Sequence, residues 1–365
     1  MKHAREFVWP VIGLLAVVVS AWLLYHELRG LSLEALWSSL TSIPTHQYLL
    51  AAASTLVAYA ALAWYDRIAL LHLGVRHISW WFVSICSFTT YALSHNIGAS
   101  VFSGALVRYR AYTSKGLSAP QVAVLVALCS FTFALGTVLL GGLVLTIEPE
   151  LFSRLPEEIP EALRDETTAR VIGLLMLGFI ALYVLGSVLH FKPLVVRSFH
   201  IEYPRPAVMV RQLVAAPLEL IGAAGIIYFA LPETGNPGFA AVLAAFLASF
   251  SAALISHAPG GLGVFELVFV AIMPEVPKAE VLAALIVFRL FYLLIPFAIA
   301  IAVVLMFERA RVAQTWRDRT AAQGLSPVPS PLHMPTTTPP AAIAPHPVAP
   351  AASVAPPPPS GVGTH

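Results

Sequence analysis

Two short polar stretches interrupt otherwise apolar parts of the sequence. Residues 92–104 read ALSHNIGASVFSG, and residues 253–265 read ALISHAPGGLGVF. Inside a membrane, a helix can break only where neighbouring protein or a water-filled cavity satisfies the freed backbone groups. The sequence therefore predicts a polar site at each stretch, around His95 in the first and His257 in the second.

The residue types at the two predicted breaks suit an anion. Glycine and proline end helices or let backbones approach closely. The half-helix after a break presents free N–H groups and the positive end of its dipole, which favour an anion such as a phosphate. The alternative is that these small residues only allow helices to pack closely. The candidate binding residues are Ser94, His95, Asn96, Gly98, Ser256, His257, Pro259, Gly260, Gly261 and Gly263.

Ionisable residues within apolar segments form a second group of candidates. Glu219, Glu266 and Arg289 lie in or beside predicted spans, where a charged side chain is costly unless it is paired or hydrated. They are translocation-site candidates, although the two acids and the base could also neutralise one another. Arg108 and Arg110, near the predicted cytoplasmic face, either hold the topology or recruit an anionic headgroup. The residues show no catalytic pairing of a nucleophile with a base, no cofactor motif and no spacing typical of a metal site.

The composition points to lipid as the main solvent. Hydrophobic residues make up 58% of the 365 positions and charged residues 11%, against about 25% charged in soluble domains. The net charge of +2 and the absence of a basic stripe argue against a nucleic-acid partner. Cys86 and Cys129 both lie in apolar runs, as expected of buried hydrophobic side chains rather than of a disulfide framework.

The apolar runs predict an all-α, polytopic integral membrane protein. A bilayer core about 30 Å thick needs roughly 20 apolar residues per helix. Two long segments, 79–106 and 238–273, contain the polar stretches, and a short amphipathic interfacial helix is expected within 28–46. Residues 1–307 form the predicted membrane domain, and 308–365 a basic end followed by a disordered Pro/Ala-rich tail. Six segments are uninterrupted, at about 7–25 (an uncleaved anchor), 47–71, 118–146, 171–190, 208–230 and 279–307.

Loop charges orient these segments, because Lys and Arg are retained on the cytoplasmic side. If the six uninterrupted segments cross and the two interrupted ones return to their side of origin, 15 Lys and Arg lie inside and 5 outside. Both termini are then cytoplasmic. The units 47–146 and 208–307 share the order span, broken segment, span, with His95 and His257 at equivalent places. Their orientations are opposite, which is the pattern of an inverted repeat.

Several ordered motifs carry a family resemblance. SHNIG, SGALVRYRAYTSKGLS, ISHAPGGLGVFE and RLFYLLIP together resemble the membrane domain of the bacterial lysylphosphatidylglycerol synthase/flippase family. The resemblance covers nearly all of residues 1–307 and implies an inner-membrane protein with re-entrant segments that moves aminoacylated or other lipids between leaflets. Some relatives stand alone, and some are associated with hopanoid synthesis. The positions that match the family motifs are His95, Asn96, Gly98, Arg108, Arg110, Pro259, Gly260, Gly261, Gly263, Glu266, Arg289, Tyr292 and Pro296. Tyr292 joins the candidate binding residues on this ground.

One departure from the family pattern bears on activity. Full-length synthases carry a soluble C-terminal domain that transfers lysine to the lipid, whereas this sequence continues into its proline-rich tail. Lipid aminoacylation is therefore not expected, and the chain is predicted not to be an enzyme. The sequence does not distinguish a phospholipid, an aminoacylated lipid and a hopanoid-type lipid as the transported lipid.

The leading hypothesis is a lipid translocase (flippase) of the inner membrane without a bound cofactor. Its partners would be membrane lipids and separately encoded lipid-synthesis enzymes. The alternative is a non-transporting accessory or scaffold protein in lipid or envelope biogenesis. An intramembrane enzyme would need an acid–base arrangement that the sequence does not offer.

Overall fold

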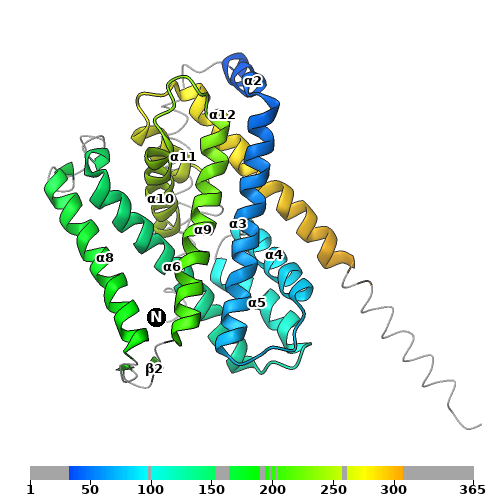
Figure 1. Ribbon diagram of the computed structural model, residues 1–365. Helices are drawn as coiled ribbons and strands as arrows, with labels where there is room; N and C mark the ends of the chain where they lie inside the picture. Colours follow the sequence, from blue (N-terminus) through cyan, green and yellow to red (C-terminus); the bar gives the residue numbers. More distant parts are fainter. Residues whose placement is uncertain are drawn as a thin grey trace, which may run out of the picture. The chain divides into compact units, whose positions relative to one another are not determined.

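The computed structural model describes residues 33–97, 100–152, 164–189, 194–196, 199–201, 204–256, 261–306 and 309. The described residues are almost entirely helical (Figure 1). Within these described ranges, the one strand pairing is a short antiparallel pair between α8 and α9. The elements are α2 (Leu33–Ser42), α3 (Thr45–His72), α4 (Trp80–Ile97), α5 (Ser100–Thr113), α6 (Ala119–Ile147), η1 (Pro149–Phe152), α8 (Glu166–Val188), β1 (Leu194–Val196), β2 (Phe199–Ile201), α9 (Pro206–Ala230), α10 (Phe239–Ser256), α11 (Val264–Ile272), α12 (Lys278–Phe288) and the π-helical η3 (Arg289–Leu294).

Six helices in the described part of the chain are long and apolar enough to cross a membrane. Five of them, α3, α6, α8, α9 and the continuous helix Lys278–Met306, confirm five of the predicted spans. The sixth is α10, which lies in the second interrupted segment. The predicted span 7–25 and the tail after residue 309 lie outside the described residues. The short helix expected within 28–46 is α2.

The first interrupted segment is a helical hairpin. Helix α4 ends at Ile97, within the SHNIG stretch, and α5 begins at Ser100. The hairpin starts and finishes at one end of the bundle, because His77 Nε2 lies 3.1 Å from the carbonyl oxygen of Lys115. Residues 79–106 therefore belong to a segment that returns to its side of origin, as the loop charges predicted (Figure 1).

The second interrupted segment is a hairpin at the opposite end. Helix α10 ends at Ser256 and α11 begins at Val264. The start of α3, the end of α9 and the start of α12 lie together at this end of the bundle, because residues of all three line one cavity of about 370 Å³. Although α10 alone is long enough to span, α11 brings the chain back to this same end (Figure 1). The units α3–α6 and α9–α12 therefore have the same order and opposite directions, as an inverted repeat requires.

The first helices of the two units, α3 and α9, pack directly on each other. A Cβ on Gly222 of α9 would lie 2.9 Å from the backbone nitrogen of Ala58 and 3.0 Å from the carbonyl oxygen of Ser54. Because these are backbone atoms, the two helices can approach this closely only with glycine at position 222. The close approach of α3 and α9 at Gly222 holds together the two halves of the repeat, which both contribute residues to the polar clusters.

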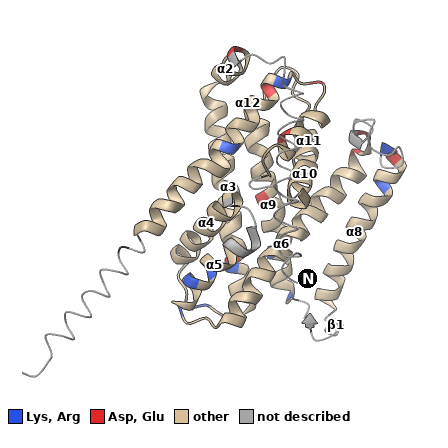
Figure 2. Ribbon diagram, turned by 180° about the vertical axis from the view of Figure 1, so that it is seen from behind, with Lys and Arg blue, Asp and Glu red and all other residues tan. Residues whose placement is uncertain are grey.

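The charged residues divide between the two ends of the bundle (Figure 2). The end at which α4 starts and α5 finishes carries mainly Lys and Arg, whereas the other end carries most of the acids together with Arg164, Arg170 and Lys278. This distribution agrees with a cytoplasmic α4–α5 end. Described residues at the first end include Arg76, Arg110, Lys115, Arg205 and Arg211, and those at the second include Glu34, Glu148, Glu150, Glu233, Glu275 and Glu280.

Candidate functional site

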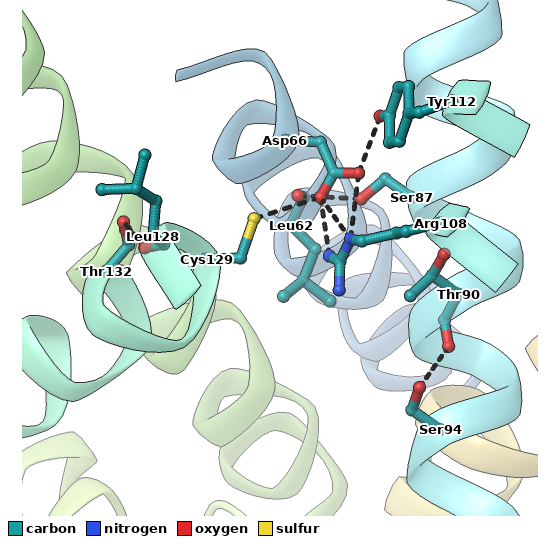
Figure 3. Close-up of polar contacts among 10 residues, drawn as sticks. All are labelled: Leu62, Asp66, Ser87, Thr90, Ser94, Arg108, Tyr112, Leu128, Cys129 and Thr132. Carbon is teal, nitrogen blue, oxygen red and sulfur yellow. Dashed lines mark hydrogen bonds and ion pairs between the residues drawn. The ribbon is translucent and has the colours of Figure 1, made fainter. Parts of the chain in front are cut away.

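A buried ion pair joins α3 to α5 (Figure 3). Asp66 is fully buried, and Arg108 is 5% exposed. The Nη2 of Arg108 donates to Asp66 Oδ1 at 2.6 Å, and its Nε lies 3.2 Å from both carboxylate oxygens. Tyr112, one helical turn after Arg108, donates its hydroxyl to Asp66 Oδ2 at 2.8 Å. Two donors on one face of α5 therefore satisfy the carboxylate on α3.

This geometry changes the interpretation of Arg108. The sequence placed it near the cytoplasmic face as a candidate phosphate ligand, but its guanidinium lies inside the bundle and is bound to Asp66. The guanidinium also lies over the ring of Tyr91, with its central carbon 4.7 Å from the ring centroid. A cation held by a carboxylate and an aromatic face has its charge compensated within the protein. The contacts of Arg108 therefore describe a structural tie between α3 and the first hairpin.

A second polar cluster lies where the two halves meet. Glu219 is 2% exposed in α9, and its Oε1 accepts a hydrogen bond of 2.6 Å from the hydroxyl of Tyr292 in η3. The ring of His95, near the end of α4, stacks on Tyr292 with 5.3 Å between centroids. Asn96 donates to the carbonyl oxygen of Leu293 at 3.1 Å. The end of the first hairpin thus contacts the last helix of the second half.

The π-helical turn η3 has a cause in the sequence. Pro296 has no N–H, so the carbonyl of Tyr292, four residues earlier, loses its usual helical partner. That carbonyl oxygen accepts instead from the hydroxyl of Tyr59 at 3.0 Å. Single π turns of this kind often occur at functional sites. The turn directs the side chain of Tyr292 to Glu219 while α3 satisfies its backbone.

A third pair connects α11 to η3. The Nε of Arg289 is bound to Glu266 Oε1, and Glu266 Oε2 accepts from the backbone N–H of Gly263 at 2.9 Å. Gly263 has a φ of 80°, in the left-handed region that favours glycine. The sequence left open whether Glu219, Glu266 and Arg289 neutralise one another. Glu266 and Arg289 do pair, whereas Glu219 is bound to Tyr292 and forms no ion pair among the described residues.

Comparisons with known proteins agree with this architecture. Residues 12–300 match the family described as the lysylphosphatidylglycerol synthase TM region. The chain belongs to this family. A Synechocystis relative, uncharacterized protein slr0712, is 28% identical over 316 residues, which are 86% of this chain and 95% of the relative. Inner membrane protein YbhN of Escherichia coli is 27% identical over 280 residues, 75% of this chain and 84% of that protein.

Membership of the lysylphosphatidylglycerol synthase TM region family confirms the resemblance that the motifs carried. With six helices able to span and an inner membrane protein among its relatives, the chain is a multi-pass inner membrane protein. The family match covers both hairpins and all three polar clusters.

The remaining predicted site residues are spread more widely. Ser94 is buried, and its Oγ donates to the carbonyl oxygen of Thr90 at 2.6 Å. Ser256 makes a similar bond of 2.8 Å to Ala253, and a Cβ on Gly261 would lie 2.9 Å from the Cβ of Ala253. Arg110 lies on the exposed side of α5. Gly98, His257, Pro259 and Gly260 lie outside the described residues, so their predicted contacts are untested.

Sequence reasoning missed two residues that the family fold brings into its polar interior. Asp66 was not among the predicted site residues, but it is fully buried and paired with Arg108. Tyr59 was not singled out, although its hydroxyl satisfies the carbonyl at the π turn. A signal for Asp66 exists in the spacing of Arg108 and Tyr112, which places two donors on one helical face. No comparable local signal marks Tyr59.

Proposed function

We propose that this protein moves the polar headgroup of a membrane lipid between the two leaflets. The observation that carries the proposal is the gathering of polar side chains from both halves inside the bundle. His95 and Asn96 from the first hairpin lie against η3, which also supplies Tyr292 to Glu219 and Arg289 to Glu266. In hydrocarbon such groups are expensive unless they serve a pathway or pair with one another.

The arrangement of the hairpins supports the same function. Each hairpin starts at one end of the bundle, and the two start at opposite ends. In transporters built from inverted repeats, rocking of one half against the other exposes a central site to each face in turn. The headgroup would cross beside the polar clusters while the acyl chains stay in lipid, which lowers the desolvation cost of crossing.

The family name and the chemistry suggest the class of ligand. The family is named for the membrane region of a synthase of lysylphosphatidylglycerol, an anionic phospholipid modified with a cationic amino acid. Arg289 and half-helix N-termini would stabilise a phosphate, and Glu266 with Asn96 would accept and donate hydrogen bonds. The chain would act on the lipid without chemical conversion, as a translocase and not an enzyme.

Exchange of labelled lipids in proteoliposomes tests the proposal. The purified protein is reconstituted with headgroup-labelled phosphatidylglycerol, phosphatidylethanolamine or lysylphosphatidylglycerol, and a membrane-impermeant quencher measures how fast the label changes leaflet. Wild-type protein should accelerate exchange of at least one lipid over protein-free liposomes. Exchange equal to that of protein-free liposomes for every lipid class would refute translocation and favour the accessory or scaffold alternative.

Matched variants connect exchange to the central residues. Glu266→Gln removes a carboxylate from the pair with Arg289 and should slow exchange. Glu166→Gln makes the same chemical change on the exposed first turn of α8 and should leave exchange unchanged. Size-exclusion profiles of both variants must match the wild type, so that slower exchange is not a consequence of misfolding.

A further inference from the structure

The two deeply buried carboxyl groups of the bundle differ in what faces them. Asp66 has a guanidinium and a tyrosine hydroxyl on its two oxygens. Glu219 has the hydroxyl of Tyr292 on Oε1, and its Oε2 has no hydrogen-bond partner among the described residues. Both residues are almost completely buried, at 0% and 2% exposure. Among the described residues, one carboxyl group therefore has a compensating cation and the other has none.

Among the described residues, the titratable side chains placed near Glu219 are the phenols of Tyr292, Tyr59 and Tyr65. Helix α3 brings Tyr59 to the backbone of Tyr292 and Tyr65 to the carbonyl oxygen of Ala216, three residues before Glu219. Arg289 lies three residues before Tyr292, but it is bound to Glu266. Among the described residues no ion pair reaches Glu219. A carboxylate removed from water without a cation is costly enough that the group holds its proton instead.

The same tyrosine contacts a second unpartnered group. The ring of His95 stacks on Tyr292, and His95 Nδ1 is buried without a hydrogen-bond partner among the described residues. Its other ring neighbour is Tyr91, with centroids 5.8 Å apart. Glu219 thus contacts the hydroxyl of Tyr292 and His95 contacts its ring, and each has one polar atom with no hydrogen-bond partner among the described residues. Buried acids and histidines within membrane helices often belong to proton relays.

We propose that Glu219 is a proton-binding site that couples lipid movement to the transmembrane proton gradient. In each cycle Glu219 binds one proton at its carboxyl group and later releases it. Only O–H and N–H bonds form and break, so the site needs no further reactant. The coupling rests on the translocation proposed above, whereas the binding of a proton by Glu219 is testable without it.

A hydrophobic carbodiimide tests proton binding directly, because it reacts with a protonated carboxyl group in an apolar environment and not with an ion-paired carboxylate. The detergent-solubilised full chain is treated with dicyclohexylcarbodiimide, and modified peptides are identified by mass spectrometry. Glu219 should be modified, and modification should decrease as the pH is raised. Asp66 is the internal control and should stay unmodified, because both of its carboxyl oxygens are engaged by Arg108 and Tyr112. An unmodified Glu219, or equal modification of Asp66, would overturn the proposal.

Proteoliposomes with an imposed pH difference test coupling. One proton moving down a difference of one pH unit provides a driving force equivalent to about tenfold in a rate. Wild-type exchange of labelled phosphatidylglycerol should therefore accelerate by up to about tenfold when the gradient is applied. In Glu219→Gln, which keeps an acceptor for Tyr292 but cannot release a proton, the ratio of rates with and without the gradient should be one. Glu166→Gln, with its change on the exposed turn of α8, should keep the wild-type ratio.

The outcomes separate this inference from the function on which it rests. If the gradient does not change the rate of lipid exchange by the wild type, coupling is refuted, whereas translocation is not. A Glu219→Gln variant that still responds to the gradient refutes the assignment of Glu219. No exchange in any liposome refutes translocation and with it coupling, and the carbodiimide reaction then decides by itself whether Glu219 binds a proton.

Discussion

Replacement of Asp66 by asparagine should be among the most destabilising single changes in this protein. The substitution leaves Arg108 charged, 5% exposed and without its carboxylate. Removing one partner of a buried ion pair costs about 3–5 kcal/mol, because the other charge is left uncompensated. At roughly 2–4 °C per kcal/mol for a chain of this size, the midpoint of thermal unfolding should fall by about 6–20 °C.

The assay is thermal unfolding in detergent, monitored by loss of the monodisperse peak in size-exclusion chromatography. Arg110→Gln is the matched control, since it removes a guanidinium from the exposed side of the same helix. Its effect should stay within about 0.5 kcal/mol of the wild type. The double variant Asp66→Leu, Arg108→Met replaces both buried charges by apolar groups and should recover most of the lost stability.

The double variant gives the sharpest refutation. If the loss reflects an uncompensated buried charge, the two substitutions together must cost less than the sum of each alone. Additive losses, or an Asp66→Asn midpoint equal to that of Arg110→Gln, would show that the ion pair does not stabilise the contact between α3 and α5.

Three further predictions concern packing, the central cluster and topology. Gly222→Leu places side-chain atoms within 3.0 Å of the α3 backbone and should lower stability by about 1–3 kcal/mol in the same unfolding assay, whereas Gly178→Leu, with nothing within 4 Å, should not. Tyr292→Phe leaves Glu219 Oε1 without its donor and should cost about 1–3 kcal/mol, against little change for the exposed Tyr109→Phe. Single cysteines at Arg110 and Glu275 should react with impermeant maleimide from opposite faces of oriented vesicles, and reaction from the same face would contradict the arrangement of the hairpins.

Much of the membrane architecture could be predicted locally. The spans follow from the length of apolar runs, because a bilayer imposes the same requirement on each helix separately. The breaks in α4–α5 and α10–α11 followed from helix-stopping residues, and the direction of each hairpin from the Lys and Arg of its flanking loops. The second hairpin shows the limit of this reasoning. Helix α10 is long enough to span, and only its contact with α11 shows that the chain returns to the same end.

The polar contacts within the bundle depended on tertiary structure. The sequence identified Glu219, Glu266, Arg289 and His95 as ionisable residues in apolar segments. The free-energy cost of burying such a side chain in a membrane can be judged from the residue type and the hydropathy of the segment. Which of them pair depends on contacts between helices that are far apart in the sequence. From the sequence, Arg108 could either hold the topology or recruit a headgroup. The packing of α5 on α3 brings it to Asp66, 42 positions away. Tyr292 contacts Glu219, 73 positions away. It lies in the π turn before Pro296, and the hydroxyl of Tyr59 donates to its carbonyl oxygen.

The sequence by itself determined that this is an all-helical membrane protein with two interrupted segments of opposite orientation, because hydropathy, helix breakers and loop charge act locally along the chain. Only the tertiary structure decided which buried charges are compensated. Asp66 and Glu219 are both acids within apolar helices, and neither residue type nor helix hydropathy separates them. The packing of α5 gives Asp66 a guanidinium, whereas the packing of η3 gives Glu219 the hydroxyl of Tyr292 and, in the part of the chain that the structure describes, no cation.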